Sequence, residues 1–95
     1  SNSFVRKASK WSYGHIKFYD TDYRDMLDKA RTVIRDSYIP EFDAQLATDY
    51  SVLESEDADA AEKAEGVERV ASFEKRRKHY SDMLAHMDTE KTILI

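Results

Sequence analysis

The chain has 95 residues, of which 36% are charged and 41% hydrophobic, with a net charge of −4 at pH 7 and no cysteine. This length corresponds to one domain, and the lack of cysteine excludes disulfides, thiolate metal sites and cysteine nucleophiles. No apolar run approaches the roughly 20 residues that cross a bilayer, so we expect a soluble, cytoplasmic protein that does not enter a membrane.

Residues that interrupt helices are scarce in this sequence. Gly14 and Gly66 are its two glycines, and Pro40 is its one proline. Few glycines and prolines combined with many charges are typical of long exposed helices rather than of β-sandwiches or barrels. The sequence therefore predicts an all-α fold: an antiparallel helical hairpin over residues 21–95, preceded by a basic, aromatic N-terminal arm over residues 1–20.

The N-terminal arm differs from the rest of the chain in charge. Residues 1–19 contain four basic residues and no acid, so the total of −4 leaves −8 for residues 20–95. Alternating aromatic residues suggest a short extended segment, but a lone strand leaves its backbone unpaired, so we favour an arm or short helix packed on the hairpin. The candidate partner-binding residues are Trp11, Tyr13, Lys17, Phe18 and Tyr19. Such residues either contact a partner or nucleic acid, or complete the core of the hairpin.

The first arm of the hairpin is predicted from about Asp22 to Glu54. Asp20, Thr21 and Asp22 are N-cap residue types. Apolar residues then recur every three or four positions: Tyr23, Leu27, Ala30, Ile34, Tyr38, Phe42, Leu46, Tyr50 and Leu53. Pro40 lacks the amide hydrogen that a continuous helix uses, so we predict a kink or break between Ser37 and Pro40. The kink is favoured because the apolar stripe resumes after the proline.

The second arm is predicted from about Asp59 to Lys91, after a turn over residues 54–59. Ser55, Asp57 and Asp59 are all plausible N-cap residues, and Asp59 followed by Glu62 resembles a helix-capping arrangement. Large side chains then alternate steps of three and four, the coiled-coil period, with Arg77 and Lys91 interrupting them. Two helices alone enclose little core, so we expect a homo-oligomer that uses this seam. The predicted interface residues are Val70, Phe73, Tyr80, Leu84, Met87 and Leu94.

Charged clusters on the second arm offer weaker candidate sites. The basic run at residues 75–79 points almost all round a helix, so we interpret it as solvated surface with contacts to acids on the first arm. The acids near the turn, from Glu54 to Glu68, could alternatively imitate nucleic acid or fill a basic pocket. A histidine and carboxylate set has spacing that could hold zinc or iron, although exposed helix pairs explain it more simply: His79, Asp82, His86 and Glu90.

The sequence contains neither a nucleophile elbow nor a glycine-rich phosphate loop. We therefore expect a non-enzymatic protein without a cofactor or metal. Our hypothesis is a small protein-interaction or assembly protein, acting as an adaptor or inhibitor on a macromolecular partner. The alternative is a nucleic-acid or nucleotide binder that uses the basic aromatic arm.

Overall fold

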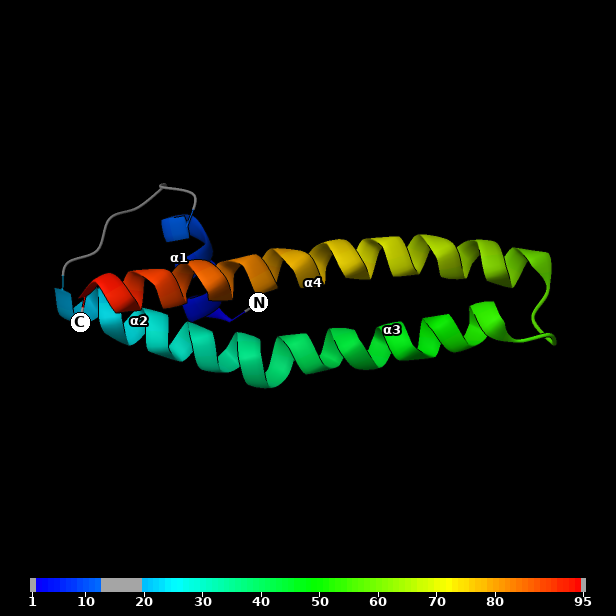
Figure 1. The fold of residues 1–95 in the computed structure, drawn as a ribbon, viewed down its shortest axis with the longest axis horizontal. Helices are drawn as coiled ribbons and strands as arrows, with labels where there is room; N and C mark the ends of the chain where they lie inside the picture. The colour runs from blue at the N-terminus through cyan, green and yellow to red at the C-terminus, as the bar shows by residue number, and fades with distance from the viewer. Residues whose placement is uncertain (1, 13–19, 95) are drawn as a thin grey trace.

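The computed structural model describes the backbone of residues 2–12 and 20–94, and the side chains of residues 2–11 and 24–89. Its elements are helical: α1 (Ser3–Ser12), α2 (Asp20–Val33), the π-helical turn η1 (Ile34–Tyr38), α3 (Ile39–Glu54) and α4 (Ala60–Leu94). Helices α2 and α3 join through η1 into a first arm, and α4 returns beside them as a second arm (Figure 1). The predicted all-α hairpin is confirmed.

The first arm continues through Pro40 rather than ending there. Val33 and Ile39, which flank η1, keep helical backbone angles, and the Ile39 amide donates a hydrogen bond to the Ile34 carbonyl. This bond spans five residues instead of four, so one extra residue is accommodated just before the proline. Pro40 then lies in the first turn of α3, where its missing donor costs little. Figure 1 shows the first arm changing direction near this turn.

A short turn over residues 55–59 connects the arms, and we call this end of the hairpin the tip. The Asp59 carboxylate caps α4 by accepting a hydrogen bond from the Glu62 amide at 2.8 Å. The Ser55 hydroxyl accepts from the Asp57 amide at 3.2 Å, which fixes the turn before the cap. Of the three N-cap candidates, Asp59 is therefore the one that caps α4.

The main core lies at the opposite end, which we call the base. There α1 contacts both arms, so that three helices enclose one apolar cluster. Because α1 contributes Val5 and Ala8 to this cluster, the prediction of a short helix packed on the hairpin is confirmed for residues 3–12. The buried members are Val5, Ala8, Met26, Leu27, Ala30, Ile34, Met83 and Met87.

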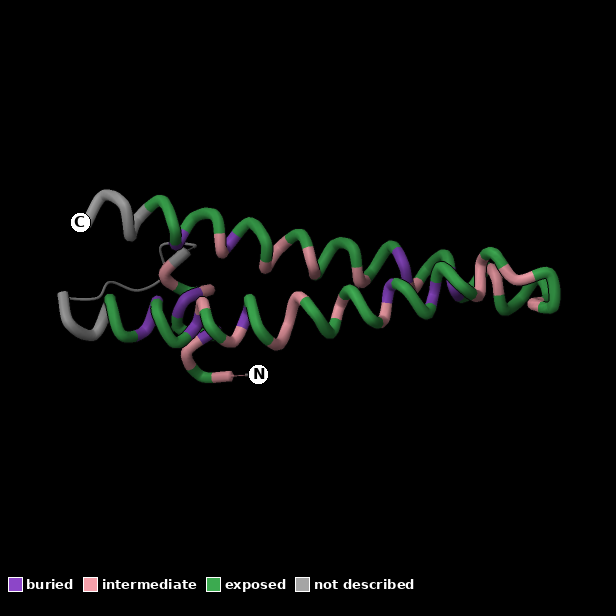
Figure 2. The backbone as a smooth tube through the Cα atoms, turned by 60° about the horizontal axis from the view of Figure 1, so that its bottom comes forward, coloured by how far each residue is buried: buried purple, intermediate pink, exposed green. Residues whose placement is uncertain are grey.

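The tip half of the hairpin is thinner, because only α3 and α4 meet there. Among the described residues, its buried side chains are Leu46, Val70 and one charged residue, Asp49. Figure 2 shows the buried positions, in purple, recurring at intervals along the facing sides of both arms. The whole molecule measures 55 × 22 × 20 Å. A rod of this kind offers a large surface relative to its core.

Candidate interaction surfaces

The N-terminal aromatic candidates fall largely outside the described residues. Tyr13, Lys17, Phe18 and Tyr19 are among those whose placement the structure does not describe. Trp11 is half-buried against the core cluster, and its ring centroid lies 4.7 Å from that of His86 on α4. Trp11 therefore takes part in packing α1 onto the hairpin, whatever contacts it makes with a partner.

The predicted oligomer seam packs inside the single chain. Val70 and Met87 are buried, while Phe73, Tyr80 and Leu84 are half-buried. Phe73 and Tyr80 both lie against Phe42, with ring centroids 6.1 and 5.8 Å apart. The side chain of Leu94 lies outside the described residues. A role for these residues between chains stays a prediction, but their main contacts join the two arms.

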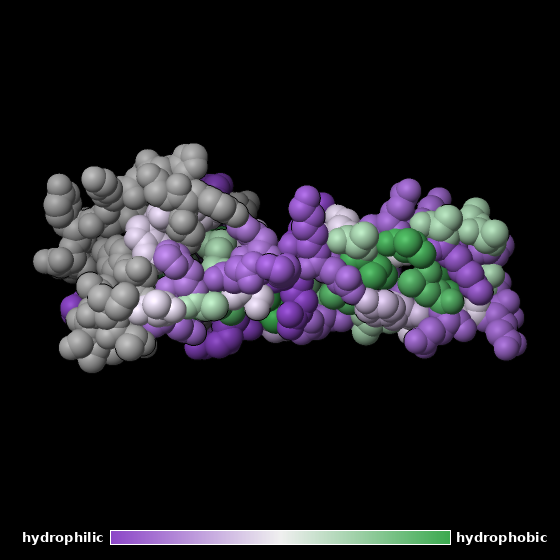
Figure 3. Space-filling model, turned by 45° about the horizontal axis from the view of Figure 1, so that its top comes forward, coloured by the Kyte–Doolittle hydropathy of each residue, from purple (hydrophilic) through white to green (hydrophobic). Residues whose placement is uncertain are grey.

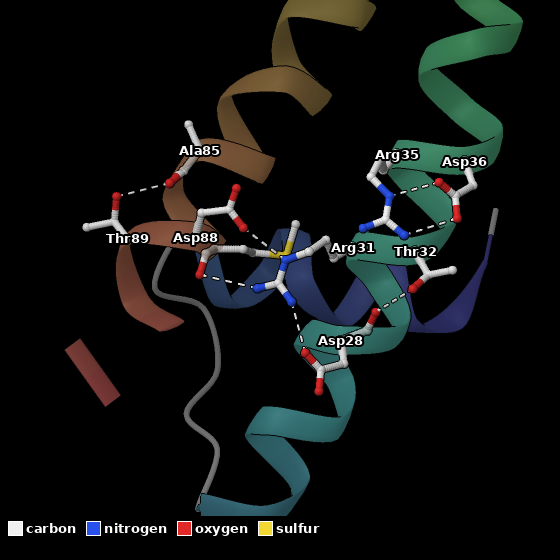
Figure 4. A network of polar contacts seen from close by, with 9 residues as sticks. Asp28, Arg31, Thr32, Arg35, Asp36, Ala85, Asp88 and Thr89 are labelled. Atoms are coloured by element: carbon white, nitrogen blue, oxygen red, sulfur yellow. Dashed lines mark hydrogen bonds and ion pairs between the residues drawn. The ribbon is translucent and has the colours of Figure 1, made fainter. Parts of the chain in front are cut away.

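A polar network near the base braces α2 against α4 (Figure 4). Arg31, whose side chain is 12% exposed, bonds Asp88 through Nε at 3.0 Å and Asp28 through Nη1 at 2.9 Å. Its third donor reaches the Met87 carbonyl at 3.5 Å. Because one guanidinium spans both arms beside the apolar core, we interpret the network as structural.

The metal candidates whose side chains the structure describes, His79, Asp82 and His86, do not come together. Within the described part of the chain, no three histidine or acidic side chains lie close enough to share an ion. Asp82 pairs with Lys78 at 2.6 Å, His86 lies against Trp11, and the side chain of Glu90 is not described. Among the described residues, no helix has the length and apolarity of a membrane span.

The basic run of residues 75–79 divides into paired and unpaired cations. Arg77 Nε lies 2.6 Å from Asp43 Oδ1 on the first arm, which confirms the predicted contact, and Lys78 pairs with Asp82. Lys75 and Arg76 form no ion pair with any described residue, and both are exposed. The two unpaired cations lie on the side of α4 that borders a groove.

This groove, which we call the aromatic groove, runs between η1, the start of α3 and the middle of α4. It has a volume of about 780 Å³ and is open to solvent. Its lining combines aromatic rings with basic side chains: Tyr38, Glu41, Phe42, Ser72, Lys75, Arg76, His79 and Tyr80. The sequence pattern places Tyr38 and Phe42 on the apolar stripe of the first arm and Tyr80 on that of the second, but spacing within one arm does not show which residues of the two arms meet.

A second surface, which the sequence patterns described above do not include, lies on the exposed side of α4 near the tip. Val67 is 58% exposed, and small apolar residues flank it at steps of four, three and four. We call this set the tip seam: Ala60, Ala64, Val67 and Ala71, all exposed. Figure 3 shows apolar side chains gathered on this half of the hairpin. The coiled-coil spacing of the tip seam was the signal that could have identified it.

No protein-family model, curated protein or solved structure matches the chain.

Proposed function

We propose that this protein is a non-enzymatic interaction and assembly protein whose hairpins associate with one another through the tip seam. Two hairpins placed with their tip seams together would form a four-helix arrangement, in which each copy supplies the same surface. The remaining surface of such an assembly is free to act as an adaptor or inhibitor for another macromolecule.

The exposure of Val67 is the observation that carries this proposal. A single exposed valine is ordinary on a protein surface, but Val67 stands in a stripe whose other members are also apolar and exposed. Glu74 lies seven residues after Val67 and so shares its face of α4, and Tyr50 donates a hydrogen bond to Glu74. Tyr50 is itself 42% exposed, so it adds exposed aromatic surface to the tip half of the hairpin, with its hydroxyl at this face of α4.

The thin tip half gives an energetic reason for two hairpins to associate. The radius of gyration is 16.9 Å, compared with about 12 Å for a compact chain of this length. Burying the tip seam against a second copy would remove more apolar surface from water, at about 25 cal/mol per Å². Small side chains also allow two helices to approach closely, which favours helix pairing over a loose contact.

Sedimentation equilibrium over a range of protein concentrations tests this proposal. We expect reversible self-association that Val67→Glu abolishes, because the charge would have to be buried in the paired seam. Ala61→Glu is the matched control, since it adds the same charge at an exposed position next to the seam and should leave association intact. A chain that stays monomeric at every concentration would contradict the proposal.

A second candidate function, nucleic-acid or nucleotide binding, is favoured by one feature of α1. Its buried residues Val5 and Ala8 face the core, whereas Arg6, Lys7 and Lys10 are all exposed. Phosphate binding by this basic face would weaken steeply with added salt. Fluorescence anisotropy with a labelled single-stranded oligonucleotide, comparing the chain with Lys7→Glu/Lys10→Glu, tests it: equal affinity of the two proteins would exclude α1 as the contact.

A further inference from the structure

We propose that the aromatic groove binds an acidic segment of a protein partner that carries an aromatic or aliphatic anchor residue. The inference rests on the proposed function only in taking a protein as the partner. It concerns a surface separate from the tip seam, so each can fail without the other.

The floor of the groove is a set of aromatic rings held against one another. Tyr80 lies edge-on to Tyr38, with centroids 5.0 Å apart, and stacks on Phe42 at 5.8 Å with 20° between the ring planes. All three side chains are half-buried, so each is fixed by packing yet keeps exposed surface. Rigid aromatic surface of this kind provides contact area at low entropic cost, which suits it to receive an apolar anchor.

The π-helical turn contributes Tyr38 to the lining of the groove. Tyr38 is the last residue of η1, and its hydroxyl accepts a hydrogen bond from the Asn2 amide at 3.2 Å. The wall of the groove is therefore positioned jointly by the start of the chain, the first arm and the second arm. Single π-helical turns occur frequently at functional sites, where they re-aim side chains.

The basic wall of the groove gives its electrostatic preference. Lys75 and Arg76 have no acidic partner among the described residues, in contrast to Arg77 and Lys78 next to them. The Arg76 guanidinium lies 5.5 Å from the centroid of the Phe73 ring, a cation–π contact that holds it beside the groove. These two cations can each pair with a carboxylate of a bound segment.

The acid in the lining does not cancel this preference. Glu41 accepts a hydrogen bond from the Ser37 hydroxyl at 3.2 Å, one turn back along its own arm. The two cations of the lining, Lys75 and Arg76, outnumber it. The groove is thus a locally basic surface on a chain whose net charge is −4.

The shape and surroundings of the groove favour a protein segment over other anions. A small molecule is held by a pocket that encloses most of its surface, whereas this groove is open along the hairpin. A long polyanion would extend past the two cations onto a body that carries a net charge of −8 over residues 20–95. A short acidic segment avoids that repulsion while its anchor side chain covers the aromatic floor.

Selection from a display library of random short peptides tests the proposal with the full chain as target. We expect the enriched peptides to combine acidic residues with an aromatic or large aliphatic residue. Their affinity should fall more than about tenfold in Lys75→Glu/Arg76→Glu, because like charges would then face each other. Lys78→Glu is the matched control, as it reverses a cation of the same run that is already paired with Asp82.

Two further measurements make the outcome decisive. The amide chemical shifts of residues 72–80 should change when the peptide is added, whereas those of residues 60–67 should not. The double variant Lys75→Glu/Arg76→Glu should keep the helical circular dichroism of the unaltered chain.

Enrichment of peptides without acidic residues, or equal binding of the peptides to the double variant and the unaltered chain, would overturn the proposal. So would a labelled single-stranded oligonucleotide that binds the groove more tightly than the selected peptides. Loss of self-association in Val67→Glu with peptide binding retained would separate the two surfaces.

Discussion

The carboxylate of Asp49 on α3 meets the guanidinium of Arg69 on α4, with 3.1 Å between Oδ1 and Nε. The two partners differ in exposure, because the Asp49 side chain is 3% exposed and that of Arg69 is 42% exposed. Gln45 also donates to Oδ1 at 3.2 Å, while Oδ2 has no hydrogen-bond partner among the described residues. A buried charge in the thin half of the hairpin thus depends on one side chain from the opposite arm.

Removing Arg69 should therefore destabilise the hairpin more than removing an ordinary surface charge. We expect Arg69→Met to lower the unfolding free energy by about 2–3 kcal/mol, because it leaves a buried carboxylate without its cation. Replacing both partners, in Asp49→Leu/Arg69→Met, should restore most of this loss. Urea unfolding measures each value, and Lys78→Met, which breaks an exposed pair, should cost less than about 0.5 kcal/mol. A double variant less stable than either single one would contradict this reading of the pair.

Gly66 lies where α4 approaches α3 closely near the tip. A Cβ at this position would stand 3.0 Å from Cδ2 of Leu53, which is the end of a flexible, half-buried side chain. We expect Gly66→Ala to stabilise the protein by up to about 1 kcal/mol, because helix propensity improves and Leu53 can shift. Gly66→Leu should destabilise it by about 1–3 kcal/mol, since a larger side chain forces the arms apart. Thermal and urea unfolding of both variants test the contrast, which would fail if the two changes had the same sign.

Asp59 is the residue that starts α4. Asp59→Ala should cost about 1 kcal/mol, because the Glu62 amide loses its acceptor, whereas Asp59→Asn should retain most of the stability. Asp57→Ala, in the same exposed turn, is the control and should change stability little. Equal losses at the two positions would show that the cap contributes nothing specific to the unfolding free energy.

Tyr80 should make the protein sensitive to alkaline pH. Burial, and secondarily the neighbouring Tyr38, raises the pKa of Tyr80 above its ordinary value of 10.0, against a smaller opposing effect of Arg76. The unfolded chain therefore loses this proton first as pH rises, so the stability present below about pH 10 falls as pH rises through the pKa of the folded state.

Unfolding free energies measured on both sides of this range test the prediction. Tyr80→Phe should show a shallower decline because it removes one of the groups with a raised pKa. Tyr50, whose hydrogen bond to Glu74 raises its pKa, contributes in the same direction and remains in that variant. An identical pH profile for Tyr80→Phe and the unaltered chain would rule out Tyr80 as a source of the decline.

Sequence patterns alone determined the two arms and the turn between them, and they narrowed the cap of the second arm to Ser55, Asp57 or Asp59, of which the structure selects Asp59. Apolar spacing of three and four specifies a helix and its buried face, and an aspartate before such a run specifies its start, because both depend on neighbours within one or two turns. The same local reasoning identified Pro40 as the place where the first arm is disturbed. This reasoning did not predict the π-helical turn at Ile34–Tyr38, because a widened helix and a broken helix both accommodate a proline that has no amide hydrogen to donate.

Only the tertiary structure decided which apolar surfaces stay exposed. The seam containing Val70 and Met87 has the pattern expected of an interface, and in the folded chain both residues are buried by the chain itself. Periodicity shows that a helix face is apolar, but not which element covers it. That choice depends on how α1 packs at the base and how the two arms align, and it leaves Val67 exposed and the aromatic groove open.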